Sequence, residues 1–337
     1  MQIDLTTARP AAIAELKQFH IACSPAQPVA PAVAIATGSV DWFFDDAPCA
    51  LHHIRARRTA ELVRSLDPAC TADAIPPRPD PTREGLVHGY AVLAQLARTP
   101  SSVVYRARHL ATRTEVALKI VPHARTSESL RREVALTLRA RGDAVVRVFD
   151  FGANSEYDYL ALELLRGETL AQRLAREPRI ADVAGLARAI ATALDGIHAA
   201  GVVHGDVKPH NIFLGDGGRV TLFDFGCAVA IGAGDERGLG TPPYIAPEQG
   251  CGNLAGRPQP LDARSDLYAL GVTLYQVLTG ALPITNKRLE NFWRWQIEAE
   301  VPHVADAPPA LAALVARSTR KRPDERFQSA RELLAYL

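Results

Sequence analysis

The sequence predicts an α+β protein in which a small β-rich part precedes a larger α-helical part. Short runs of alternating apolar and polar residues, rich in Val, Ile and Tyr, dominate residues 90–165. From Thr169 onward, apolar residues recur at helical spacing instead. Residues 76–85 contain four prolines in six positions, which favours a stiff, extended linker between this unit and the N-terminal residues.

Composition narrows the class of protein. The chain has 337 residues, and 38 Lys and Arg against 37 Asp and Glu give no electrostatic reason to expect nucleic acid or an acidic membrane as a partner. No apolar run approaches the roughly 20 residues that span a bilayer, and the N-terminus lacks the apolar stretch of a Sec signal. The five cysteines are scattered without a CxxC pair, as is typical of free thiols in a reducing compartment. We therefore expect a cytoplasmic protein without a membrane span, with secretion by a non-Sec route as an open alternative.

The N-terminal extension, residues 1–75, carries no constellation of chemical groups. Apolar spacing predicts a short helix after Pro10 and a second helix after Pro48, and residues 32–44 fit either a strand or a buried loop. The extension is either a small helical module that docks on the small lobe or on a regulatory partner, or a partly disordered arm. We place the Pro-rich linker at 76–88 and the main unit at 89–337.

The elements of the main unit follow from periodicity and turn signals. Strands are predicted at 90–96, 103–110, 114–121, 145–152 and 159–165, and a helix at 129–140. Further helices are predicted at 169–175, 183–200, 265–280 and 328–337. Residues 212–222 contain two β runs around GDGG, which predicts a hairpin.

The polar loop HGDVKPHN, residues 204–211, holds chemically active side chains. Asp206 can accept a proton from a hydroxyl, and Lys208 can neutralise charge that grows on a transferred group. Asn211 supplies an oxygen ligand suited to Mg²⁺, and the hairpin brings the carboxylate of Asp224 back beside it. A general base, a lysine and an oxygen-ligated metal are the groups that phosphoryl transfer needs.

Upstream and downstream residues complete this set. Lys119 lies on a predicted strand and could hold phosphates, and a half-buried lysine needs an acidic partner such as Glu133 on the following helix. The turn-rich segment GTPPYIAPEQ, residues 240–249, carries Thr241 and Glu248.

These motifs, in this order, resemble those of eukaryotic-like bacterial Ser/Thr protein kinases. VALK resembles the β3 lysine motif of that family, HGDVKPHN its catalytic loop, DFG its metal-binding motif and APE the end of its activation segment. SDLYALG resembles the following helix with a buried Asp266, and RPDERF the late motif whose Arg326 pairs with Glu248. The resemblance covers about residues 90–337. It implies a bilobal protein-kinase-like fold, with a β-rich N-lobe at about 89–165 and an α-helical C-lobe at about 166–337.

The resemblance also implies the cofactors, the substrates and the roles of individual residues. ATP and Mg²⁺, with Mn²⁺ as an alternative, serve as cofactors, and proteins with Ser or Thr acceptors serve as substrates. Asp206 is the catalytic base, and Lys208 neutralises the γ-phosphoryl group and with Thr241 indicates Ser/Thr acceptors. The metal ligands are Asn211 and Asp224. Lys119, paired with Glu133, contacts the α- and β-phosphates, and the phosphate loop contributes Ala97, Ser101 and Ser102. The hinge Glu163–Leu165, after the gatekeeper Leu162, meets the edge of adenine. Val104, Ala117 and Phe213 pack on the two faces of the adenine ring.

The phosphate loop departs from the pattern of the family. The glycines of GxGxxGxV are replaced by Ala97, Thr99 and Ser102, although glycine allows close approach of the backbone to phosphates. Pro100 at the tip has no N–H to donate. We therefore predict a weaker affinity for ATP, or a less mobile loop, with the amides and hydroxyls of Ser101 and Ser102 as partial substitutes.

The catalytic loop and the activation segment depart together. Gly205 replaces the Arg that usually receives a phosphate on the activation segment, and residues 227–239 contain no Ser, Thr or Tyr. This predicts activity that does not depend on phosphorylation there.

The connection from Lys119 to Glu133 is short, and Thr137 puts a hydroxyl where the family prefers an apolar residue against Phe225. A pseudokinase or scaffold, and a small-molecule phosphotransferase, are the rival readings.

Overall fold

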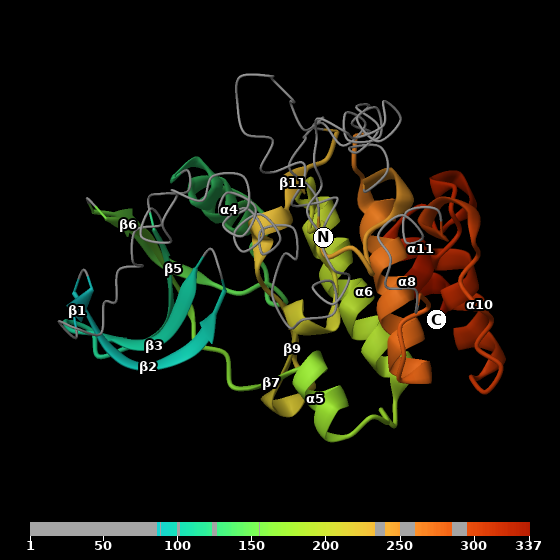
Figure 1. Ribbon diagram of the computed structural model, residues 1–337, viewed down its shortest axis with the longest axis horizontal. Coiled ribbons are helices and arrows are strands. Elements are labelled where there is room, and N and C mark those ends of the chain that lie inside the picture. The colour runs from blue at the N-terminus through green and yellow to red at the C-terminus, as the bar shows by residue number, and fades with distance from the viewer. Residues whose placement is uncertain are drawn as a thin grey trace, which may run out of the picture.

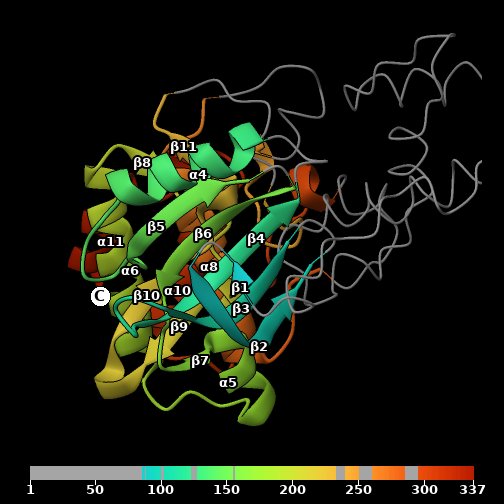
Figure 2. The same ribbon diagram turned by 90° about the vertical axis from the view of Figure 1, so that its left-hand side faces the viewer.

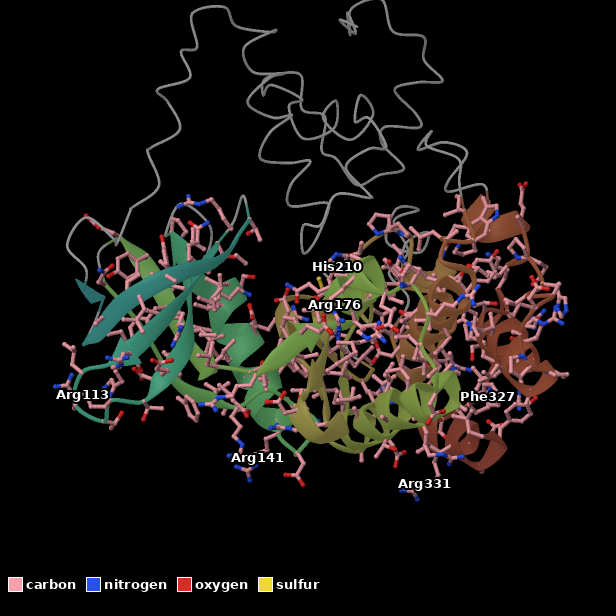
Figure 3. All side chains as sticks on the ribbon, turned by 90° about the horizontal axis from the view of Figure 1, so that it is seen from below. Arg113, Arg141, Arg176, His210, Phe327 and Arg331 are labelled. Carbon is pink, nitrogen blue, oxygen red and sulfur yellow. The ribbon has the colours of Figure 1, made fainter. Side chains whose placement is uncertain are left out.

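The computed structural model describes residues 86–87, 89–99, 102–122, 127–154, 156–232, 240–249, 260–284 and 295–337. They form two lobes, a sheet with one helix and a larger helical body (Figure 1). Arg113 lies at the far end of the sheet lobe and Phe327 at the far end of the helical lobe (Figure 3). The predicted α+β fold is confirmed. The helices predicted within residues 1–75, and most of the linker, lie outside the described residues.

The N-lobe is an antiparallel sheet with the strand order β1-β2-β3-β4-β6-β5. Its strands are β1 (Leu86–Val87), β2 (Tyr90–Arg98), β3 (Val103–His109), β4 (Glu115–Pro122), β5 (Val148–Ala153) and β6 (Tyr157–Glu163). Alternation decides the faces of β4, since Val116, Leu118 and Ile120 are buried in one apolar cluster with Tyr105. Lys119 consequently lies on the opposite face of the sheet.

Helix α4 (Ser127–Arg139) covers the other face of the sheet beside β5 and β6 (Figure 2). Leu130 and Val134 of α4 pack against Leu160 of β6 in a small buried cluster. The helix also packs against the short turn Phe225–Cys227 of the C-lobe, and Phe225 is 1% exposed. This contact joins the sheet lobe to the DFG motif.

The C-lobe is organised around helices and short strand pairs. Its helices are α5 (Leu170–Arg176), α6 (Val183–Ala199), α8 (Ala263–Thr279), α10 (Pro309–Ser318) and α11 (Ala330–Tyr336). Its strands are β7 (Gly167–Thr169), β8 (Val202–Val203), β9 (Ile212–Gly215), β10 (Val220–Leu222) and β11 (Val229–Ala230). Helix α6 begins at the N-cap Asp182, whose carboxylate accepts from Gly185 N–H at 2.7 Å. Helices α6, α8, α10 and α11 enclose the main apolar core.

Two of the predicted N-lobe strands begin two or three residues away from the observed start, and the other three agree with the structure to within two residues at each end. The strand predicted at 145–152 begins only at Val148, because Val145 instead forms an isolated parallel bridge to Leu222 of the C-lobe. The strand predicted at 159–165 covers 157–163 and ends before Leu165. The hairpin at 212–222 is confirmed by the antiparallel pairing of β9 and β10. Among the described helices, none is both long enough and apolar enough to cross a membrane.

Candidate active site

The β9–β10 hairpin brings the two predicted metal ligands to one end of the C-lobe. Asn211 immediately precedes β9, Asp224 follows β10, and Phe223 N–H donates to Asn211 C=O at 3.2 Å. Asp224 has a φ of 62°, a left-handed conformation that turns the chain sharply at the DFG motif. The hairpin thus places Asn211 and Asp224 side by side, as the sequence predicted.

Asp206 lies at the centre of a buried hydrogen-bond network. Its Oδ2 accepts from Lys208 Nζ and from Asn211 Nδ2, both at 3.0 Å, and its Oδ1 accepts from Thr241 N–H at 2.7 Å. Lys208 Nζ also donates to Thr241 Oγ1 at 2.5 Å. Burial opposes the charge of Lys208, but Asp206 outweighs it, so the pKa of Lys208 is raised. The network holds a carboxylate and an ammonium ion at fixed positions in a protein interior.

Asp266 of α8 anchors the backbone of the catalytic loop. Its carboxylate accepts from the backbone N–H groups of His204 and Gly205, both at 2.8 Å, and from His198 Nε2 at 2.8 Å. The predicted burial of Asp266 is confirmed at 1% exposure. The buried Asp266 carboxylate therefore holds the catalytic loop and His198 through three hydrogen bonds.

The ring of His204 packs on the DFG motif. Its ring centroid lies 4.7 Å from that of Phe225. Nδ1 accepts from Asp206 N–H at 3.3 Å, which leaves Nε2–H to donate to Phe223 C=O at 3.1 Å. These contacts join the catalytic loop to the DFG motif through the ring of His204.

Lys119 joins the sheet, α4 and the DFG motif. Its Nζ lies 2.7 and 2.9 Å from the two carboxylate oxygens of Glu133 and 3.1 Å from Asp224 Oδ1. Burial opposes the charge of Lys119, but Asp224 and Glu133 outweigh it, and its pKa is raised. Burial raises the pKa of Glu133. Burial also favours a higher pKa at Asp224, but the positive charges of Lys119 and Lys208 outweigh it, so the pKa of Asp224 is lowered. The structure therefore brings together the lysine and glutamate that the sequence paired.

Thr137 shows how α4 accommodates a polar residue next to this site. It is 3% exposed, and its hydroxyl donates to Glu133 C=O at 2.7 Å, one turn earlier in the helix. The hydroxyl is therefore satisfied within α4 rather than by the DFG motif.

The phosphate loop is closed by its own side chains. Thr99 N–H donates to Ser102 C=O at 2.8 Å, and Ser102 N–H donates to Thr99 Oγ1 at 2.9 Å. The two hydroxyl oxygens lie 3.0 Å apart, and each residue is 6% exposed. The amide and hydroxyl predicted for Ser102 as phosphate contacts are thus already engaged inside the loop. Ser101 lies outside the described residues, and Ala97 is exposed on β2 beside Val104.

The predicted adenine contacts lie on the expected elements. Val104 faces Lys119 across the β3–β4 pair, and Ala117, two residues from Lys119, shares its face of the sheet. Phe213 is half-buried on β9, with its ring 6.3 Å from that of Phe223. The position of adenine among these side chains stays a prediction.

The hinge carries an ion pair that the sequence did not reveal. Glu163 Oε1 accepts from Arg219 Nη1 at 3.1 Å, and Arg219 Nε donates to Asp143 C=O at 3.0 Å. Arg219 immediately precedes β10 in the C-lobe, whereas Glu163 ends β6 in the N-lobe. The pair therefore bridges the lobes next to Leu165.

The donor set beside Asp206 fits a hard divalent cation. Asn211 Nδ2 donates to Asp206 C=O and to its carboxylate, so the amide oxygen is the group left to bind a metal. Asp224 uses Oδ1 for Lys119 and retains a second carboxylate oxygen. Among the described residues, no group of three or more His, Cys, Asp or Glu side chains is placed to hold a metal ion. One carboxylate and one amide, completed by phosphate oxygens and water, is the arrangement that Mg²⁺ accepts.

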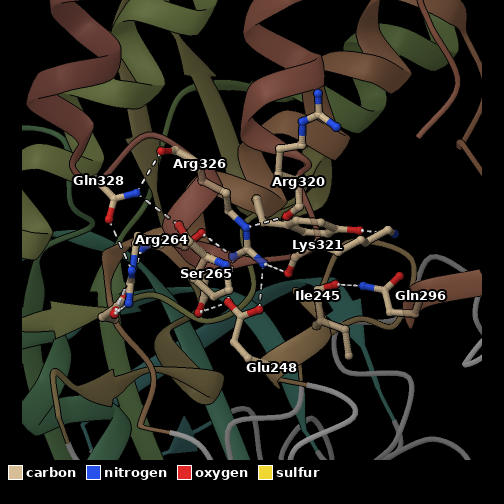
Figure 4. Close-up of polar contacts among 12 residues, drawn as sticks. Ile245, Glu248, Arg264, Ser265, Gln296, Arg320, Lys321, Arg326 and Gln328 are labelled. Atoms are coloured by element: carbon tan, nitrogen blue, oxygen red, sulfur yellow. Dashed lines mark hydrogen bonds and ion pairs between the residues drawn. The ribbon is translucent and has the colours of Figure 1, made fainter. Parts of the chain in front are cut away.

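The end of the activation segment is tied to the C-terminal part of the chain (Figure 4). Arg326 donates to both carboxylate oxygens of Glu248, at 2.7 and 2.8 Å, which confirms the predicted pair. Ser265 Oγ donates to Glu248 at 2.9 Å, and Gln296 donates to Ile245 C=O. These contacts fix the segment 240–249 against the start of α8 and against Gln296 and Arg326.

The chain matches the model of the protein kinase domain over residues 90–336. It belongs to the protein kinase family. The predicted family, with its bilobal fold, is confirmed. Among its relatives is the serine/threonine-protein kinase PknL of Mycobacterium tuberculosis, 34% identical over 268 residues, which cover 74% of this chain and 65% of PknL.

Two other bacterial relatives of this protein kinase are more distant. A probable serine/threonine-protein kinase of Clostridium acetobutylicum is 30% identical over 264 residues, and PrkC of Bacillus subtilis is 27% identical over 261 residues. The match covers 74% and 73% of this chain, respectively, but 39% of each relative. This chain therefore spans less than two thirds of the length of these relatives.

Proposed function

We propose that this protein transfers the γ-phosphoryl group of ATP to Ser or Thr hydroxyls of protein substrates. The observation that carries this proposal is the buried network of Asp206, Lys208 and Thr241, placed next to the Lys119–Glu133 pair by the DFG motif. Relatives named as serine/threonine-protein kinases support the same activity.

Each residue of the network has a separate task in this reaction. Asp206 accepts the proton of the acceptor hydroxyl, and the three donors on its carboxylate hold the side chain in one orientation. Lys208 neutralises charge that grows on the transferred group and, through Thr241, fixes where the acceptor side chain lies. Lys119, held by Glu133, positions the α- and β-phosphates.

Asn211 and Asp224 would hold Mg²⁺, or Mn²⁺ with the same oxygen ligands. When bound, the metal neutralises charge on the phosphate oxygens. The lowered pKa of Asp224 keeps its carboxylate ionised and available as a ligand as the pH falls below neutral.

The rival readings predict different observations. A pseudokinase or scaffold would bind nucleotide without transfer, although every side chain assigned to the chemistry is present. A small-molecule phosphotransferase would leave proteins unlabelled, whereas the segment 240–249 resembles a peptide-docking platform.

Activity should not require phosphorylation of the activation segment. Residues 227–239 contain no Ser, Thr or Tyr, and Gly205 offers no cation to receive a phosphate. Thr241 is 5% exposed, and its hydroxyl is bonded to Lys208, so it is poorly placed to be phosphorylated in this arrangement.

A transfer assay tests the proposed function directly. With radiolabelled ATP and generic protein substrates, we expect label on Ser and Thr that disappears when EDTA removes the metal. Treatment of the protein with phosphatase beforehand should leave the rate unchanged. Stabilisation by nucleotide without transfer would instead support a binding protein, and a requirement for phospho-Thr241 would contradict the independence from phosphorylation.

The closed phosphate loop should limit the affinity for ATP. Replacing both loop residues, Thr99→Gly and Ser102→Gly, removes the side-chain bonds that hold the loop shut and frees the Ser102 amide. Because a hydrogen bond contributes about 0.5–1.5 kcal/mol net, we expect the KM for ATP to fall roughly 2- to 10-fold with little change in kcat.

A matched control lies in the β3–β4 turn, at the opposite end of β3 from the phosphate loop. Thr112 makes comparable side-chain bonds, to His109 and Thr114, but far from the predicted phosphates. Thr112→Gly should leave the KM for ATP unchanged. An increased KM in the double glycine variant would show that the Thr99–Ser102 pair itself helps to bind the nucleotide.

The remaining assignments stay predictions. They are the domain limits, a cytoplasmic location and a regulatory partner that binds residues 1–75. Limited proteolysis near residues 76–85 would release a stable N-terminal fragment if the extension is a folded module.

A further inference from the structure

The segment Gly240–Gln249 lies directly on the catalytic loop. A side chain at Gly240 would collide with Gly205 C=O and would lie 2.9 Å from Asp206 Oδ1, so only glycine allows this approach. Thr241 then reaches both Asp206 and Lys208 with its N–H and its hydroxyl. The catalytic loop and this segment are therefore in direct contact without any phosphate between them.

Gln249, at the other end of the segment Gly240–Gln249, makes a second contact with the catalytic loop. The side chain is 1% exposed, and its Nε2–H donates to Gly205 C=O at 2.6 Å. This carbonyl belongs to the peptide group that joins Gly205 to Asp206, whose N–H donates to His204 Nδ1 at 3.3 Å. Because a peptide group is planar, a bond at each end fixes its orientation, and with it the position from which Asp206 projects.

The position of Gln249 is itself determined by the C-terminal network. Gln249 N–H donates to Ala246 C=O at 3.0 Å, and the preceding residue, Glu248, is held by Arg326 at 2.7 Å and by Ser265 at 2.9 Å (Figure 4). A side chain anchored in this way can resist displacement of the loop.

Gly205 shows why another residue must hold the loop. Its φ is +76°, and a Cβ there would lie 2.5 Å from Cys227 C=O, just after the DFG motif. The Arg that the family places at this position would therefore be strained and would push the activation segment away. In this arrangement there is no room for a phosphate-binding Arg, and Gln249 makes the contact to Gly205.

We propose that Gln249 is a positioning residue for phosphoryl transfer, which holds the Gly205–Asp206 peptide in place of a phosphate-dependent clamp. The inference rests on the proposed kinase function, because it assigns Gln249 to the placement of Asp206. Gln249 does not touch the reacting groups and acts only through the backbone of the catalytic loop.

The test removes the hydrogen bond from Gln249 to Gly205 and keeps the size of the side chain. Gln249→Met retains the length of the side chain but leaves the buried Gly205 carbonyl without its donor, which costs about 1–3 kcal/mol. Because displacement of Asp206 relieves this cost, kcat should fall roughly 5- to 150-fold. The KM for ATP should stay unchanged, since the predicted ATP contacts, such as Lys119, lie elsewhere.

Gln276→Met is the matched control. Gln276 accepts a hydrogen bond from Tyr244 OH at 2.7 Å, so this variant loses one side-chain bond to the same segment without touching the catalytic loop. We expect near wild-type kcat for Gln276→Met. A purely structural role of Gln249 would lower the thermal midpoint of both variants and spare kcat in the fraction that remains folded.

Hydrogen exchange separates failure of this inference from failure of the proposed function. In Gln249→Met, amide exchange should accelerate in the peptide containing residues 203–208, and not in Gln276→Met, whether or not the wild type transfers phosphate. Absence of transfer in the wild type would defeat the proposed function alone. Unchanged exchange together with unchanged kcat in Gln249→Met would overturn the positioning role.

Discussion

Asp206→Asn should reduce phosphoryl transfer by about 10²- to 10⁴-fold, the usual contribution of a general base. The amide cannot accept the proton of the acceptor hydroxyl. It also introduces a conflict, because Asp206 Oδ2 accepts from Lys208 and Asn211 while Oδ1 accepts from Thr241. Whichever way the amide turns, its NH₂ group faces a donor. The measurement is kcat with a generic protein substrate, at saturating ATP.

Two controls separate catalysis from folding in this variant. Asp216→Asn makes the same chemical change in the exposed turn of the β9–β10 hairpin and should leave kcat unaltered. Thermal stabilisation of Asp206→Asn by ATP should persist, since Lys119 and Asp224 are unchanged. Transfer at the wild-type rate in Asp206→Asn would show that the acceptor loses its proton to another group.

The sequence predicted the elements whose signal is local. The β-rich run TEVALKIV predicted the strand that carries Lys119, and the GDGG turn predicted the hairpin that returns Asp224 beside Asn211. Both results follow from periods and turn chemistry within a few residues. The pairing of Lys119 with Glu133 was predictable because a half-buried lysine needs an acidic partner, and Glu133 lies on the helix that follows its strand.

Other features depend on contacts between distant segments and have no local signal. The bond from Gln249 to Gly205 joins residues 44 positions apart, and the pair Arg219–Glu163 joins residues 56 positions apart. The strand predicted to begin at Val145 was wrong at its start, because a bridge to Leu222 takes that residue into the C-lobe. Apolar composition alone does not say which lobe a residue joins.

The loss of glycines in the phosphate loop was visible in the sequence, but its structural consequence was not. Thr99 and Ser102 form hydrogen bonds with each other. These bonds restrain a loop that glycines would leave flexible. At position 205 the sequence showed only that the Arg of the family is missing. The structure supplies a reason, because the backbone of Gly205 has a positive φ, a conformation that favours glycine.

Arg326→Met should be the most destabilising single change considered for this protein. The Arg326 side chain is 0% exposed, and besides Glu248 it donates to the carbonyls of Arg320, Lys321 and Arg264 at 2.7, 2.9 and 3.0 Å. Its removal leaves a mostly buried carboxylate without its cation, which costs about 3–5 kcal/mol. For a domain of this size, the thermal midpoint should fall by roughly 6–20 °C.

Arg331→Met supplies the matched control, because Arg331 is 82% exposed and only 3.5 Å from Asp195, in a surface pair expected to contribute about 0–1 kcal/mol. Adding Glu248→Met to Arg326→Met should recover part of the loss, since no charge then stays buried without a partner. The same ion pair supports Gln249, so Arg326→Met should also lower kcat in the folded fraction. Equal stability of Arg326→Met and Arg331→Met would mean that Glu248 reaches solvent, and that the C-terminal network does not hold the catalytic loop.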